Sequence, residues 1–149
     1  KILKDLGTPC IIHQPKYNMF DRWVENGLLD TLETEGIGSI VFSPLAQGML
    51  TDRYLNGFPE DSRAVKDGRF LNTEQINTML SKIKSLNKIA QERGQSLAQM
   101  AISWILKDDR ITSVLIGASK TEQIEDSLKA TDNTTFSKEE IDKIESVLG

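Results

Sequence analysis

Residues 41–54, which read VFSPLAQGMLTDRY from Val41 to Tyr54, decide the fold. The apolar run Ile40–Phe42 stops at Ser43 and Pro44, and a polar loop that contains glycine follows it. This pattern predicts a short buried strand whose carboxyl end opens into a functional loop. The polar segment continues to residue 72, and a connection of this length inside a compact domain is unusual unless it works on a ligand.

Strands and helices are expected to alternate along the chain. Hydrophobic periodicity predicts strands at residues 10–14, 39–42 and 112–116, and helices at residues 20–35, 73–93, 96–107, 119–130 and 137–148. The capping-box pattern that starts a helix occurs at Ser96 with Gln99, Ser119 with Glu122, and Ser137 with Glu140. Because strands alternating with helices favour parallel βαβ units, the expected fold class is α/β.

Two architectures fit this order of elements. The first is a small three-layer domain, for which 149 residues suffice. The second is part of a (β/α)₈ barrel, which normally needs about 250 residues. Three parallel strands make a poor independent sheet, since both of its edges stay open.

Composition limits the classes of function. The formal net charge of −4 argues against general nucleic-acid binding, and no apolar run approaches the length of about 20 residues needed to span a membrane. The single cysteine, Cys10, cannot form an internal disulfide, which favours a reducing, cytoplasmic setting. We expect this thiol to pack inside the fold. The chain has neither an apolar leader nor a starting methionine, and is expected to be a cut chain.

Three stretches resemble the aldo-keto reductases in the order and separation of their motifs. They are residues 41–54, residues 13–18 (HQPKYN) and residues 113–123 (SVLIGASKTEQ). The similarity is greatest to the branch that holds the potassium-channel β-subunits and the bacterial L-glyceraldehyde-3-phosphate reductases. The resemblance implies that residues 1–149 form the C-terminal part of one (β/α)₈ TIM barrel, namely strands six to eight with their helices.

The same resemblance implies a site for NADP(H) at the carboxyl ends of the strands. Gln14 would bind the nicotinamide carboxamide, and Phe42 would stack on the nicotinamide ring, where the family usually carries Tyr or Trp. Ser43, Leu45 and Gln47 would contact the diphosphate region. Without the resemblance, the alternative for Gln14 is a polar residue at the end of a strand, and the alternative for Phe42 is a side chain of the core.

The phosphate on the adenosine ribose would have its own contacts. The resemblance assigns the 2′-phosphate to Arg53 and Arg63 and to Gly117, Ser119 and Gln123, and the adenine to Asp126 and Ser127. Relatives usually carry Glu and Asn at the last two places, which weakens the adenine assignment. The alternatives are that both arginines are solvated surface charges and that Ser119 is only a helix cap.

No catalytic residue is assigned within this chain, since the family's Tyr-Lys-Asp-His tetrad would lie on the missing strands. His13 is expected to face the helices, and no histidine or cysteine cluster has the spacing of a metal site. The implied parent reduces small aldehydes and ketones with NADPH, with glyceraldehyde 3-phosphate and methylglyoxal as candidate substrates. A redox-sensing partner like the channel β-subunits and an inactive fragment are the alternatives. The isolated chain is expected to self-associate and the parent to form a homo-oligomer.

Overall fold

Three short parallel strands form the centre of the molecule. The computed structural model describes residues 2–55, 57 and 73–149. The strands β1 (Ile12–His13), β2 (Gly38–Val41) and β3 (Ile111–Val114) lie side by side in that order. Since all three run in the same direction, their carboxyl ends meet at one edge of the sheet.

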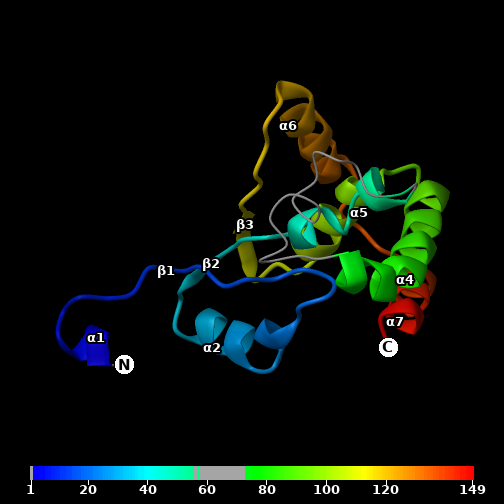
Figure 1. Cartoon of the computed structure of the whole chain (residues 1–149). Helices are drawn as coiled ribbons and strands as arrows, with labels where there is room; N and C mark the ends of the chain where they lie inside the picture. Colours follow the sequence, from blue (N-terminus) through cyan, green and yellow to red (C-terminus); the bar gives the residue numbers. More distant parts are fainter. Residues whose placement is uncertain (1, 56, 58–72) are drawn as a thin grey trace.

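Helices follow each strand. The described α-helices are α1 (Ile2–Asp5), α2 (Leu28–Thr34), α4 (Thr73–Glu92), α5 (Leu97–Leu106), α6 (Thr121–Leu128) and α7 (Lys138–Leu148). Single 3₁₀ turns, η1 to η4, occupy Trp23–Glu25, Ala46–Gly48, Asp52–Tyr54 and Lys129–Asp132. In Figure 1 the short helix α1 lies apart from the rest of the molecule, at the end of an extended segment.

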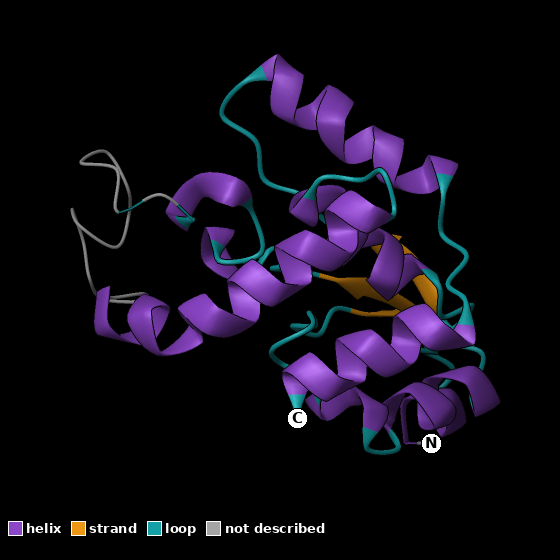
Figure 2. Cartoon of the chain, turned by 90° about the vertical axis from the view of Figure 1, so that its right-hand side faces the viewer, coloured by secondary structure: helices purple, strands orange, loops and turns teal. Residues whose placement is uncertain are grey.

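In the part of the chain that the structure describes, the helices cover one face of the sheet and leave the other face uncovered. Helix α5 packs against β3, α4 and α6, and α7 packs against α4. Figure 2 shows these helices in front of the strands when the molecule is viewed from the helix side. Trp104, Met100 and Ala101 of α5 are completely buried in this layer. Burial of this apolar helix face provides most of the stabilisation that holds α5 on the sheet.

Most of the predicted elements are confirmed, with shorter strands. The predicted helix at residues 73–93 is α4, and the capping boxes at Ser96 and Ser137 start α5 and α7. The continuous helix expected at residues 20–35 is wrong. It is split into η1 and α2 by Gly27, whose φ of +91° cannot continue a right-handed helix.

The expected burial of Cys10 is also wrong, because its thiol is exposed. The residues around it precede β1, which is an edge strand with a neighbour on only one side. Ile11 and Ile12 are likewise 72% and 51% exposed. An apolar run predicts burial only if another element covers it, and in the described residues no element covers this run.

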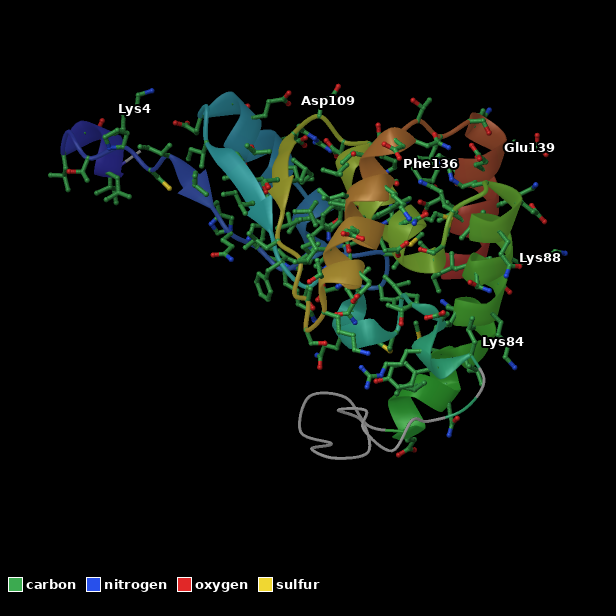
Figure 3. The ribbon with its side chains drawn as sticks, turned by 90° about the horizontal axis from the view of Figure 1, so that it is seen from above. Lys4, Lys84, Lys88, Asp109, Phe136 and Glu139 are labelled. Atoms are coloured by element: carbon green, nitrogen blue, oxygen red, sulfur yellow. The ribbon has the colours of Figure 1, made fainter. Side chains whose placement is uncertain are left out.

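Arg93 ties the end of α4 to the segment before α7. Its side chain is 2% exposed and forms a 2.5 Å ion pair with Glu140. The guanidinium also donates to the carbonyl of Thr135 at 3.1 Å and lies 3.7 Å from the ring centre of Phe136, which is labelled in Figure 3. These contacts lie in the outer helical layer, beyond α5.

Candidate functional site

The uncovered side of the sheet, here called the open face, carries Ile12, Gln14, Ile40 and Phe42. Strand register pairs His13 with Ser39 and Ile12 with Gly38. Because Ser39 and Val41 are buried on the helix side, alternation places Ile40 and Phe42 on the open face, and Gln14 opposite His13. Phe42 and Leu115 are each 42% exposed, so among the described residues no element covers these two side chains.

Gln14 and Phe42 lie at the carboxyl ends of neighbouring strands, as predicted. The segment after β1 holds the Phe42 backbone on both sides. The Phe42 N–H donates to the carbonyl of Pro15 at 3.0 Å, and the Tyr17 N–H donates to the carbonyl of Phe42 at 3.3 Å. The exposed amide of Gln14 and the exposed ring of Phe42 are therefore presented together on one surface.

The loop after Phe42 has an unusual backbone conformation. Ser43, Ala46 and Gln47 have φ values of +59°, +46° and +59°. The left-handed region costs a residue with a Cβ roughly 1–2 kcal/mol. Such a conformation persists only where surrounding contacts impose it, and it is often found at ligand sites. Leu45, in the same loop, is partly buried and packs against the core, which leaves only the exposed part of its side chain for the predicted cofactor contact.

Asn18 holds the start of this loop, and the sequence reasoning assigned it no role. Its side chain is 1% exposed, and its amide nitrogen donates to the carbonyl of Ser43 at 3.0 Å. Its amide oxygen accepts from the Phe20 N–H at 3.0 Å. The sequence feature that could have drawn attention to Asn18 is its position between Tyr17 and Met19, two large side chains that are both buried.

The third strand leads to the predicted phosphate-binding segment. Leu115 donates its N–H to the carbonyl of Val41 at 2.8 Å, which brings residues 115–117 to the same edge of the sheet as Phe42. Gly117 and Ser119 follow and are exposed, and α6 begins at Thr121.

The predicted capping box of Ser119 with Glu122 is wrong. Gln123 is the side chain that reaches back, and its Oε1 accepts from the N–H groups of Ser119 at 2.8 Å and Lys120 at 3.2 Å. The N-cap of α6 is Lys120, one residue later than predicted, so Gln123 and not Glu122 is the third residue of the helix. These are N–H groups that a phosphate oxygen would use, so an anion would displace the Gln123 oxygen.

The two residues assigned to the adenine, Asp126 and Ser127, already form hydrogen bonds within the protein. Asp126 accepts from Gln99 at 2.6 Å and from Ser96 at 3.3 Å, so its carboxylate joins α6 to the start of α5. Ser127 donates its hydroxyl to the carbonyl of Gln123. Arg53 is exposed in η3, and Arg63 lies outside the described residues.

A charged network lies behind the loop, on the helix side. The buried hydroxyl of Tyr17 donates to Glu25 at 2.7 Å, and Arg22 pairs with both Glu25 and Glu145. Burial, followed by the hydrogen bond to Glu25, raises the pKa of Tyr17 far above its ordinary value. The Tyr17 hydroxyl is thus engaged with Glu25 on the buried, helix side of the loop. Burial alone would raise the pKa of Glu25, but hydrogen bonds from Arg22 and Tyr17 outweigh it and hold that pKa below 4.5.

The lowered pKa of Glu25 predicts a loss of stability in acid. Its ionised form stabilises the fold fully above its unfolded pKa, and this contribution disappears as the pH falls through the folded pKa. We expect Glu25→Gln to lower the free energy of unfolding by about 1–2 kcal/mol near neutral pH and by progressively less as the pH falls through the folded pKa of Glu25. Urea unfolding of both proteins across this range measures the difference. A difference that stays constant with pH would show that Glu25 is not the titrating group.

The described parts of the chain contain neither a candidate membrane-spanning helix nor a candidate metal-binding cluster. No helix there is both long enough and apolar enough to cross a membrane. Within the same residues, no group of three or more His, Cys, Asp or Glu side chains is arranged to hold a metal ion.

Known proteins resemble the chain along nearly its whole length. The L-glyceraldehyde 3-phosphate reductase of Escherichia coli is 51% identical over 150 residues, covering 97% of this chain and 43% of that protein. A probable voltage-gated potassium channel subunit beta of Oryza sativa is 40% identical, covering 97% of this chain and 45% of its own length. The chain thus spans less than half the length of these relatives.

A solved structure and a family model agree with these relatives. The glycerol dehydrogenase of Gluconobacter oxydans has a TM-score of 0.73 and 26% sequence identity, covering 92% of this chain and 42% of that one. The match confirms the expected fold class, part of an aldo-keto reductase barrel. The model of the Aldo/keto reductase family matches residues 1–148. The chain belongs to the aldo/keto reductase family.

Proposed function

We propose that a complete barrel containing this chain reduces small aldehydes and ketones with NADPH, and that this chain supplies much of the cofactor site. The observation that carries the proposal is the joint exposure of Gln14 and Phe42 on the open face. An amide offers both a donor and an acceptor to the nicotinamide carboxamide, and an aromatic ring offers a flat face to the nicotinamide. The cofactor would supply the hydride, while these residues bind and orient it.

Two further features support a phosphorylated cofactor. The backbone N–H groups of Ser119 and Lys120, which donate to the Gln123 side chain in this structure, lie just before α6, where partial positive charge favours an anion that takes the place of that side chain. Arg53 and, outside the described residues, Arg63 are the cations assigned to the 2′-phosphate. Preference for NADPH over NADH follows, since NADH lacks that phosphate.

The 51% identity to a protein named L-glyceraldehyde 3-phosphate reductase favours a small phosphorylated aldehyde as substrate. The lower identity of 40% to a probable channel subunit makes a redox-sensing partner the second candidate. A metabolic reductase should turn over many equivalents of NADPH, whereas a regulatory partner should bind the cofactor tightly and turn it over slowly.

A chimaeric barrel tests the proposed reaction. In it this chain replaces the matching segment, 43% of the length, of the Escherichia coli relative. We expect the purified chimaera to oxidise NADPH when glyceraldehyde 3-phosphate or methylglyoxal is added. The unaltered relative serves as the positive control. Cofactor binding without turnover on any small aldehyde would favour the regulatory role, and absence of binding would contradict both.

The chain by itself should behave differently. Its open face exposes Ile12, Phe42 and Leu115, and soluble monomers rarely expose a contiguous apolar surface beside free strand edges. We expect the isolated chain to self-associate and to show no aldehyde reduction, because it contains no residue matched to the family's proton donor. Light scattering at increasing protein concentration measures the association. A stable monomer at all concentrations would contradict this prediction.

A further inference from the structure

We propose that Asn18 is a positioning residue for the cofactor, acting through the loop of residues 43–48. The inference rests on the proposed function, because it concerns the same site. Asn18 does not lie on the open face, since its side chain is 1% exposed. Its influence on a ligand must therefore pass through the backbone groups that it binds.

The Ser43 carbonyl is the point where this influence enters the loop. It accepts the side-chain amide of Asn18 at 3.0 Å and the N–H of Ala46 at 3.1 Å. The second of these bonds closes the first turn of the loop, and Ser43 and Ala46 both have positive φ values. Asn18 thus fixes the carbonyl around which this left-handed turn is built.

Asn18 is itself held in place before it reaches the loop. Its backbone N–H and carbonyl exchange hydrogen bonds with Asp21 at 3.2 and 3.0 Å, and its side-chain oxygen accepts from Phe20. A buried amide with both ends satisfied has little freedom to rotate. The amide nitrogen is therefore aimed at Ser43 whether or not a ligand is bound.

The position of Asn18 in the chain links two parts of the proposed site. Gln14 lies four residues earlier on the same segment, and Pro15 and Tyr17 bind the backbone of Phe42 between them. The bond from Asn18 to Ser43 continues this row of contacts by one residue. One segment consequently sets the relative positions of Gln14, Phe42 and the start of the loop.

Two substitutions in the chimaeric barrel separate this role from general stability. Asn18→Asp keeps the acceptor for the Phe20 N–H and removes the donor to Ser43, whereas Asn18→Leu removes both without adding charge. The matched control is Gln95→Leu, which removes another buried amide. Gln95 donates to Ser103 at 3.0 Å and to the carbonyl of Asn133, in the helical layer away from the loop.

We expect both Asn18 variants to bind NADPH about tenfold more weakly than the unsubstituted chimaera, because both lose the hydrogen bond from Asn18 to the Ser43 carbonyl that positions the loop. The aldehyde KM at saturating NADPH should change less than twofold (roughly the scatter of independent sites). The control Gln95→Leu should lower the thermal midpoint of unfolding about as much as the Asn18 substitutions do, and should leave NADPH affinity unchanged. If the Asp variant does not fold, the Leu variant decides.

The outcomes distinguish this inference from the proposed function. An unsubstituted chimaera that does not bind NADPH overturns both. If it binds NADPH and the Asn18 variants bind equally well, only the role of Asn18 is overturned. Equal losses of affinity in Asn18→Leu and Gln95→Leu would assign the effect to stability and would also overturn it.

Discussion

Phe42→Ala in the chimaeric barrel should lower aldehyde turnover up to about a hundredfold and weaken NADPH binding about tenfold. Phe42 is 42% exposed and lies on the open face, while its backbone is fixed by Pro15 and Tyr17. Truncation therefore removes the stacking surface without removing the strand. The larger effect on turnover follows because an untethered nicotinamide loses the orientation that hydride transfer requires. Steady-state kinetics and fluorescence titration measure the two quantities.

The matched control for Phe42 is another exposed apolar residue of the same face. Ile12 is 51% exposed and is the first residue of β1, two positions before Gln14. Ile12→Ala should change NADPH affinity less than twofold, within the scatter of independent sites. Phe42→Trp should bind NADPH at least as well as the unsubstituted protein, because Trp has the larger aromatic face. If Phe42→Ala leaves both turnover and affinity unchanged, Phe42 is only a packing residue.

Arg93→Leu should lower the free energy of unfolding by about 2–4 kcal/mol. The guanidinium is almost completely buried and binds Glu140, the Thr135 carbonyl and the Phe136 ring. Leucine would leave Glu140 without its partner and the carbonyl without a donor. Since these groups join α4 to the segment before α7, the loss should appear in the cooperative unfolding transition. Urea denaturation of the chimaeric barrel measures it.

An exposed lysine of α7 provides the control for Arg93→Leu. Lys143 lies 3.5 Å from Glu92 and 3.8 Å from Glu139, and all three side chains are about half exposed or more. Figure 3 shows Glu139 on the outer side of the helical layer. Exposed ion pairs contribute about 0–1 kcal/mol, so Lys143→Ala should change stability little. Equal effects of the two substitutions would contradict the structural role given to Arg93.

The fold could be predicted where one local pattern determines the element. Helix α4 has a long apolar stripe, and the capping boxes at Ser96 and Ser137 mark helix starts that need no distant partner. The break at Gly27 has a local cause that helical periodicity alone does not reveal, since Asn26-Gly27 is a turn dipeptide and the glycine has a positive φ. The exposure of Cys10 could not be predicted from the local pattern, because it depends on which elements lie beside the residue.

The candidate site could likewise be predicted only where a local pattern determines the position of a residue. Strand alternation was enough to place Gln14 opposite His13, and Phe42 with Ile40. It could not reveal that Gln123 caps its own helix or that Asp126 binds Gln99, because such bonds depend on where α6 begins and on its contact with α5. Asn18 was missed because its role lies in a hydrogen bond to Ser43, 25 residues away in the chain.

The most direct test of the proposed cofactor site is a crystal structure of the chimaeric barrel with NADP⁺ bound. We predict that the nicotinamide ring stacks on Phe42 with ring centres roughly 4.5–7 Å apart, and that its carboxamide forms hydrogen bonds with Gln14. A nicotinamide bound away from the open face, with Gln14 and Phe42 free of the cofactor, would contradict the proposal that this face holds the reactive end of the cofactor.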